Sequence, residues 1–425
     1  MARTRFDRKV IGWALYDWAN SAFATTVLAG FFPIFFKEYW ASDLAPTDST
    51  FWLGVVNSVA SLFMVIGAPV LGALADQSGR IKRFLAAFCL LGVLATASLM
   101  WTPAGAWPLA MAVFFLATVG FAGGNLYYDA LLPRVAAGDR LERVSALGFG
   151  LGYLGGGLLF AVNVAMVRWP AFFGLADGVE AVRWSFITVA AWWLVFSVPL
   201  FAWVPRTQRQ PHHQASYLAA LRAGAGRVGR TIREIRKYPS VMWFLVAYWL
   251  YIDGVDTVVR MAADYGLAIG LEAADLMTAL LVTQFVGFPA ALVFGVIGQR
   301  VGPRRGILAG IAVYLVILLW AYRINSAAEF YVLAVAVGLV QGGVQALSRS
   351  LFVRLIPPER SGEFFGFYNM MGKFAVILGP LIVGAVAVLT RDSRLSILAV
   401  AVLFLAGGGI LAAIRLPESA GGRAK

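Results

Sequence analysis

A short motif that occurs twice in the chain decides how the rest of the sequence is interpreted. The two copies read Gly72-Ala-Leu-Ala-Asp76-Gln-Ser-Gly79-Arg80-Ile-Lys82-Arg83 and Gly295-Val-Ile-Gly-Gln299-Arg-Val-Gly302-Pro-Arg304-Arg305. Glycines and basic residues fall at matching offsets, although Gln299 takes the place of Asp76. Each copy directly follows a long apolar run. The motif therefore predicts that the chain consists of two repeated halves with the same orientation.

Apolar runs long enough to cross a membrane make up most of the sequence. Of 425 residues, 60% are hydrophobic and 13% charged, whereas soluble domains carry about 25% charged residues. This composition excludes a soluble enzyme, a nucleic-acid-binding module and a disordered protein. A membrane-spanning helix needs about 20 apolar residues, and twelve such runs lie near 11–36, 51–75, 84–101, 107–132, 144–167, 184–204, 240–262, 275–299, 306–323, 329–356, 364–389 and 394–415. We predict an all-α membrane protein with 12 transmembrane helices.

The placement of lysine and arginine predicts the orientation in the membrane. Segments on the side of the two termini hold 26 of these residues, and the opposite loops hold 7. Cytoplasmic loops carry the excess of Lys and Arg. Both termini are therefore expected in the cytoplasm, and the net charge of +13 is assigned to these loops and to lipid rather than to nucleic acid.

One long polar segment divides the predicted spans into two sets of six. We expect an N-terminal half at 1–204, a cytoplasmic linker at 205–239 and a C-terminal half at 240–425. Within the linker, Leu221, Val228 and Ile232 recur at helical spacing among several arginines. This pattern favours an amphipathic helix on the membrane surface, and a plain solvated linker is the alternative.

The whole pattern resembles the major facilitator superfamily (MFS), in which twelve spans form two halves and a Gly-x-x-x-Asp-x-x-Gly-Arg loop follows the second span. Two further stretches are similar to the branch that contains the fungal vacuolar amino-acid effluxers of autophagy and their bacterial relatives. They are Gly12-Trp-Ala-Leu-Tyr-Asp-Trp-Ala-Asn-Ser-Ala-Phe23 and the run from Gln345-Ala-Leu-Ser-Arg-Ser-Leu-Phe352 through Pro357-Pro-Glu-Arg360 to Phe364-Phe-Gly-Phe-Tyr-Asn369 and Gly372-Lys-Phe374. The resemblance implies that spans one, four, seven and ten line a central cavity, and that a small polar solute, possibly an amino acid, is exported by alternating access.

Ionisable residues inside apolar spans are costly and are candidates for function. They are Asp17, Asp129, Asp253, Asp256, Arg349 and Lys373. Similar depth predicts a pair between Asp17 and Arg349, and a second pair between Lys373 and either Asp253 or Asp256. A buried acid whose cation comes and goes can exchange a proton near neutral pH, which predicts proton coupling. Static ion pairs that only fix helix packing are the alternative, and Asp129 is expected to be interfacial, beside Arg134.

Uncharged polar residues on the spans are the candidates for solute binding. They are Asn20, Asn57, Asn125, Tyr127, Tyr128, Gln284, Gln341, Gln345, Ser348 and Asn369. Lining both halves, they favour a polar solute over a lipophilic one. The alternative for each is an interhelical hydrogen bond, which contributes about 0.6 kcal/mol on average.

The repeated motif is expected to act as a gating loop. Its candidate residues are Gly72, Asp76, Gly79, Arg80, Gly295, Gln299, Gly302 and Arg304. Gly72 permits close helix approach, Gly79 permits a tight turn, and Asp76 can cap the N-terminus of a neighbouring helix. The resemblance implies that this loop holds the halves together in one state of the transport cycle. A basic loop that only sets topology is the alternative.

Several classes of protein are disfavoured by what the sequence contains. One cysteine, Cys89, and two adjacent histidines, His212 and His213, give no disulfide framework or metal site. The Gly150-Leu-Gly152-Tyr-Leu-Gly155 run lies inside an apolar span, which favours packing glycines over a dinucleotide loop. We expect a monomeric, cofactor-free, non-enzymatic transporter of the bacterial plasma membrane, driven by a proton gradient. An exporter of drug-like compounds and a receptor or scaffold that has lost transport are the alternatives.

Overall fold

The computed structural model describes residues 6–205, 236–268, 273–324, 326–374, 378–390 and 393–414. Within these ranges, 12 helical segments are long and apolar enough to cross a membrane, which confirms the predicted number of spans. They are Arg8–Trp40, Phe51–Asp76, Ile81–Trp101, Trp107–Val135, Gly138–Arg168, Gly178–Trp203, Pro239–Val259, Asp275–Val301, Pro303–Ala321, Ala327–Leu355, Pro358–Val383 and Leu395–Ala413. The amphipathic helix expected in the linker falls almost entirely on residues 206–235, outside the described ranges.

The N-terminal spans are formed by six stretches of helix. The first contains α1 (Arg8–Ala22), α2 (Phe32–Phe35) and two wide-turned π-helical stretches, η1 (Phe23–Phe31) and η2 (Phe36–Trp40). The next five are α3 (Pro46–Ser78), α4 (Ile81–Ser98), α5 (Trp107–Val135), α6 (Leu141–Arg168) and α7 (Gly178–Trp203). Short 3-10 turns, such as η3 (Leu99–Trp101), lie at several helix ends. The first span thus continues to Trp40, four residues beyond the predicted run.

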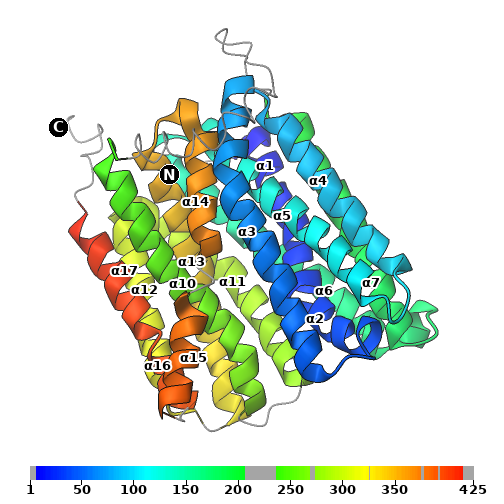
Figure 1. Cartoon of the computed structure of the whole chain (residues 1–425). Coiled ribbons are helices and arrows are strands. Elements are labelled where there is room, and N and C mark those ends of the chain that lie inside the picture. The colour runs from blue at the N-terminus through cyan, green and yellow to red at the C-terminus, as the bar shows by residue number, and fades with distance from the viewer. Residues whose placement is uncertain are drawn as a thin grey trace, which may run out of the picture.

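The C-terminal spans follow in the same order, and each of the last two is described as two helices. They are α10 (Pro239–Ala268), α11 (Ala273–Val301), α12 (Pro303–Ala321), α13 (Ala327–Leu355), α14 (Ser361–Phe374) with α15 (Leu378–Thr390), and α16 (Ser393–Leu398) with α17 (Ala401–Ala413). Figure 1 shows the two sets side by side, α1–α7 on one side and α10–α17 on the other. The first helix begins and the last helix ends at the same end of the bundle, here called the terminal end (Figure 1).

Each set of helices buries its own apolar core. One core gathers large rings such as Trp13, Trp40 and Trp193. The other gathers Tyr251, Tyr314 and other rings from α10–α17. The two sets meet where α6 packs on α11 and α13, and where α3 packs on α14. A separate core in each set means that the contacts between the sets can change without unfolding either one.

The contact between α3 and α14 at the terminal end is made by backbone. A Cβ atom added to Gly72 would overlap the carbonyl group of Gly362, and one added to Gly366 would lie 2.6 Å from the carbonyl oxygen of Ala68. Gly79 ends α3 with φ of +62°, a left-handed conformation that glycine adopts without strain. The predicted roles of Gly72 in close approach and Gly79 in a tight turn are therefore confirmed.

Gly72→Ala should weaken the packing of α3 on α14. Overfilling a tight helix contact costs about 1–3 kcal/mol, so the midpoint of thermal unfolding in detergent should fall. Gly54→Ala is the matched control on the same helix, because a Cβ atom at Gly54 has no neighbour within 4 Å. Equal melting temperatures for the two variants would contradict the proposed contact.

Candidate functional site

A polar cavity of about 260 Å³ lies between the two sets of helices. Its lining residues come from α1, α5, α6, α10, α13 and α14: Asp17, Asn125, Tyr128, Asp129, Phe149, Tyr248, Ile252, Asp256, Gln345, Arg349, Tyr368, Asn369, Gly372 and Lys373. Spans one, four, seven and ten contribute, as expected. Spans five and eleven contribute as well, through α6 and α14.

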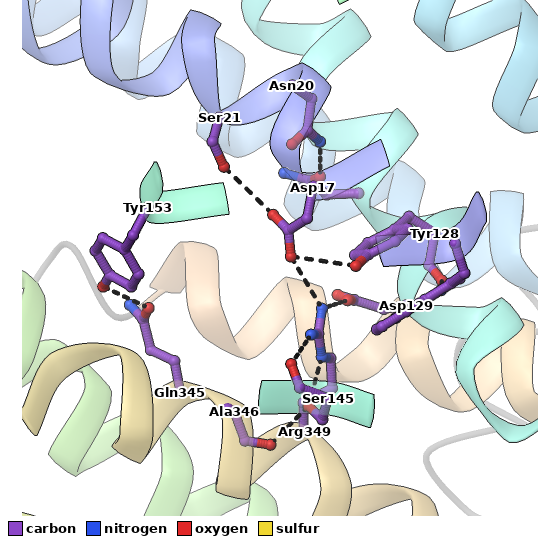
Figure 2. Close-up of polar contacts among 12 residues, drawn as sticks. Asp17, Asn20, Ser21, Tyr128, Asp129, Ser145, Tyr153, Gln345, Ala346 and Arg349 are labelled. Carbon is purple, nitrogen blue, oxygen red and sulfur yellow. Dashed lines mark hydrogen bonds and ion pairs between the residues drawn. The ribbon is translucent and has the colours of Figure 1, made fainter. Parts of the chain in front are cut away.

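Arg349 is the buried cation of this cavity, with a relative exposure of 2%. It belongs to α13, yet its hydrogen-bond partners belong to the N-terminal set of helices (Figure 2). Its Nε donates to the hydroxyl of Ser145 at 3.0 Å and its Nη2 to the carbonyl oxygen of Ser145 at 2.9 Å. Its Nη1 donates to Oδ1 of Asp129 at 3.0 Å. The guanidinium therefore joins the two sets of helices through charge-assisted hydrogen bonds.

Aromatic rings enclose the same guanidinium. Its central carbon lies 4.8 Å from the centre of the Trp13 ring, 5.3 Å from that of Tyr128 and 4.2 Å from that of Phe149. Trp13 and Tyr128 stack on each other with ring centres 4.4 Å apart. Rings at these distances attract a cation through their negative faces, and they keep water away from it.

Asp17 is the second acid beside Arg349. Its Oδ2 lies 3.8 Å from Nη1 of Arg349, so the structure contains the predicted pair. Asp17 also accepts hydrogen bonds from the hydroxyl of Tyr128 at 3.2 Å and from that of Ser21 at 3.3 Å (Figure 2). Asp129 is nearer to the cation than Asp17, and the interfacial position expected for it is wrong. Two carboxylates thus share one guanidinium.

A second group of charged residues lines the cavity on the side of α10 and α14. Asp256 and Lys373 both belong to the lining. The hydroxyl of Tyr153 on α6 donates to Oε1 of Gln345 on α13 at 3.5 Å (Figure 2). The lining therefore carries three acids and two cations, from both sets of helices.

Asp253 does not take part in this lining, and its place in the solute pathway is not supported. Its side chain is fully buried and accepts hydrogen bonds from the backbone N–H groups of Leu378 at 3.0 Å and Gly379 at 2.9 Å. The hydroxyl of Thr257 donates to it at 3.3 Å. The carboxylate is thus occupied by hydrogen bonds from the eleventh span and from its own helix. Of the two acids proposed to face Lys373, Asp256 is the one in the cavity.

The uncharged candidates divide into two groups. Asn125, Tyr128, Gln345 and Asn369 line the cavity, and Asn369 donates to Asp129 at 3.5 Å. The others lie outside this lining. Asn20 donates to Asn125, Tyr127 to the carbonyl of Leu71 and Gln284 to the hydroxyl of Thr25, and these are the interhelical hydrogen bonds that were the alternative. Asn57 and Ser348 donate to carbonyl groups of their own helices, those of Leu53 and Val344, and Gln341 is half-buried on α13.

Asp76 closes the terminal end on the side of α3 and α14. Its Oδ1 accepts from the backbone N–H of Gly362 at 3.1 Å and its Oδ2 from that of Glu363 at 2.8 Å. These N–H groups belong to the first turn of α14, where the helix dipole favours a negative charge. The structure confirms that Asp76 caps a neighbouring helix, and the helix belongs to the other set.

The second copy of the motif does not form an equivalent cap. Gly295 and Gly298 on α11 pack against the start of α6. A Cβ atom added to Gly295 would lie 2.5 Å from Cβ of Ala146, and one added to Gly298 would lie 3.2 Å from Cγ of Glu142. Arg304 donates to the carbonyl oxygen of Ile414 at the end of α17, within its own set. Lys82 acts in the same way on Phe201 and Val204 at the end of α7. One basic residue of each copy, Lys82 and Arg304, thus anchors the last span of its own set.

A sequence profile described as "Vacuole effluxer Atg22 like" matches residues 47–421. The chain belongs to the Atg22-like family. It is 36% identical over 413 residues to the "Uncharacterized MFS-type transporter YxiO" of Bacillus subtilis (strain 168), covering 96% of this chain and 95% of that protein. It is 23% identical over 508 residues to "Autophagy-related protein 22" of Coccidioides immitis (strain RS), covering 90% and 82%. These findings confirm a transporter of the MFS in the Atg22 branch.

Solved structures show the same fold at low sequence identity. The human organic anion transporter MFSD10 (TETRAN) has a TM-score of 0.70 at 15% identity, covering 95% of this chain and 98% of that one. The proton:xylose symporter XylE, bound to 6-bromo-6-deoxy-D-glucose, has a TM-score of 0.68 at 12% identity, covering 95% and 94%. The predicted fold is therefore confirmed, and this Atg22-like chain is a multi-pass membrane protein.

Sequence analysis missed several residues of the site. Ser145 holds Arg349 partly through its backbone carbonyl, which no residue type reveals. Glu142 is fully buried and forms a bidentate pair with Arg354, at 2.7 and 2.9 Å, between α6 and α13. Glu142 lies just before the predicted apolar run at 144–167 and was therefore left out of the candidates. An acid so close to a span is nevertheless a sign of a functional or structural role.

Asp76→Ala should loosen the terminal end of this Atg22-like transporter. Hydrogen bonds to a charged group contribute about 1.5–3 kcal/mol each, so the ratio of closed to open molecules should fall by at least about tenfold. Spin labels introduced by Arg83→Cys and Glu359→Cys, in a Cys89→Ser background, should report longer distances. Gln299→Ala removes the corresponding side chain of the second motif and should leave the distances unchanged. An unaltered distance distribution in Asp76→Ala would argue against the cap.

Proposed function

We propose that this Atg22-like protein is a secondary active transporter that exports a small polar solute by alternating access and couples this transport to protons. The observation that carries the proposal is the charged cavity between two separately packed sets of helices. Asp76 and Arg349 join the two sets near the terminal end. If these contacts break and one set of helices rocks against the other, the cavity would become exposed at the terminal end.

The terminal end is proposed to face the cytoplasm. The support is the excess of Lys and Arg in the segments on that side, 26 against 7. With that orientation, the state described here is closed toward the cytoplasm. The relative from Bacillus subtilis favours a bacterial plasma membrane as the location.

Proton coupling is supported by the arrangement of two acids around one cation. Arg349 makes its short contact to Asp129 and the longer one, 3.8 Å, to Asp17. A second negative charge in a poorly hydrated site is costly unless it is paired or protonated. We therefore assign the exchangeable proton to Asp17 and propose that its release and uptake accompany the opening of the contacts around Arg349.

The character of the solute follows from the lining. Carboxylates, an ammonium, a guanidinium and amide groups line the cavity, and such groups recognise a polar molecule with its own charges. An amino acid carries charges of both signs, and the family description names effluxers. We therefore propose an amino acid as the first class to test, with export as the direction. A lipophilic solute would offer neither charges nor hydrogen bonds to these polar groups.

Flux measurements in proteoliposomes test this proposal. With an imposed pH gradient, at least one radiolabelled amino acid from a panel should move in a gradient-dependent manner. Empty liposomes and dissipation of the gradient with a protonophore serve as controls. Flux of drug-like compounds alone would favour the lipophilic exporter, and no flux of any compound would favour a receptor or scaffold.

Asp17→Asn should abolish net proton-driven transport and retain exchange of solute for solute, because the amide cannot carry the proton but can keep its hydrogen bond to Tyr128. Asn57→Ala is the matched control, since Asn57 bonds to its own helix outside the cavity. The measurement compares net flux with counterflow in the same vesicles. Net flux at the wild-type level in Asp17→Asn would refute the assignment of the proton to Asp17.

A further inference from the structure

The residues that line the cavity carry more negative than positive charge. Among the described lining residues, three are acids, Asp17, Asp129 and Asp256, and two are cations, Arg349 and Lys373. Charges enclosed in a poorly hydrated space are costly unless they are balanced. One further positive charge would balance this lining, and either a proton or a solute can bring it.

The excess negative charge lies on the side of Arg349. Asp256 of α10 and Lys373 of α14 contribute one charge of each sign on their side of the cavity. Figure 2 shows Asp17 and Asp129 directed at the same guanidinium, with contacts of 3.8 Å and 3.0 Å. The unbalanced charge therefore belongs to the group formed by Asp17, Asp129 and Arg349.

Within this group, Asp17 is the carboxylate that the protein compensates less. Asp129 accepts a hydrogen bond from Nη1 of Arg349 at 3.0 Å. The same nitrogen lies 3.8 Å from Asp17, beyond hydrogen-bond distance. The described residues that donate to Asp17 are the neutral hydroxyls of Tyr128 and Ser21, and hydrogen bonds from neutral donors are weaker than those from charged ones.

The surroundings of Asp17 do not cancel its charge. Charged and titratable groups reach it from its own helix and from three others: Tyr16 of α1, Tyr128 and Asp129 of α5, Tyr153 of α6 and Arg349 of α13. Tyrosine is neutral near pH 7, so these groups add one negative and one positive charge to that of Asp17. The group as a whole keeps one negative charge until a proton or another cation arrives.

We propose that the transported solute carries a net positive charge, which takes the place of the exchangeable proton beside Asp17. The inference rests on the proposed function for the cavity and its proton, and it narrows the solute to small organic cations such as amino acids with a cationic side chain. Tyr248, Ile252 and Tyr368 also belong to the lining, and their apolar surface suits the carbon chain of such a solute. Because the proton and the solute balance the same carboxylate, binding of either one favours release of the other.

Solutes that differ in a single charge test the proposal. Arginine and citrulline form one matched pair, and lysine and Nε-acetyllysine form another. Binding is measured by isothermal titration calorimetry with the full-length protein in detergent. At least one of the two cationic solutes should bind at least about tenfold more tightly than its neutral partner, because a charge pair in protein surroundings changes affinity by at least that factor.

The pH dependence should have a definite sign. Lowering the pH should weaken binding of the cationic solute and leave that of its neutral partner unchanged, because a proton on Asp17 removes the excess negative charge. The guanidinium of arginine stays charged throughout, so the change with pH belongs to the protein.

Asp17→Asn should reduce the preference for the cationic solute by at least about tenfold and remove its pH dependence. Asp17→Glu keeps the charge and should keep both. Asp253→Asn is the matched control, since it makes the same chemical change at a buried acid outside the lining, and it should bind like the wild type.

Three results would overturn the proposal: neutral partners that bind as tightly as the cationic solutes, binding of none of the four compounds, or a preference that persists in Asp17→Asn. Flux in proteoliposomes separates this inference from the proposed function. Gradient-dependent flux of neutral amino acids alone would overturn the inference and leave the proposed function intact. Absence of flux for every amino acid, cationic ones included, would count against the proposed function itself.

Discussion

The structure depends on the cost of holding charges away from water inside a membrane. A buried charge needs a counter-charge or several hydrogen bonds, and Arg349 has both, from Ser145 and Asp129 on the opposite set of helices. Separating the sets would remove these partners together. The requirement that stabilises the closed arrangement therefore also opposes its opening. In the proposed mechanism, a proton on Asp17 is the change that lowers the cost of separating the two sets of helices.

Backbone N–H groups meet the same requirement without a cation. Asp76 accepts two of them in the first turn of α14, and Asp253 accepts those of Leu378 and Gly379. The partial positive charge of a helix start cannot leave as a side chain can, because it belongs to the backbone. Asp76 makes this contact between the sets of helices, and Asp253 makes it within one set. One type of interaction thus serves closure in the first case and internal alignment in the second.

The sequence was sufficient to predict the spans, because apolar runs of this length are typical of membrane helices and rare in soluble proteins. It was also sufficient to predict the Asp17–Arg349 pair, because the depth of a residue in the membrane can be counted along its helix. It could not separate Asp253 from Asp256. The two lie on one helical face, and only the positions of Leu378 and Gly379 decide which of them accepts their N–H groups. Asp129 was misjudged because its partner depends on how α5 is rotated against α13.

The two copies of the motif differ in how they join the sets of helices at the terminal end. Gly72 and Gly295 both permit close packing, but beside Gly295 the acid is Glu142 of α6, which pairs with Arg354 of α13. The guanidinium of Arg354 is 33% exposed, whereas the N–H groups bound by Asp76 belong to a packed helix. An exposed cation is already partly hydrated, so parting from its acid costs it less. The two sides of the closure therefore resist opening to different degrees.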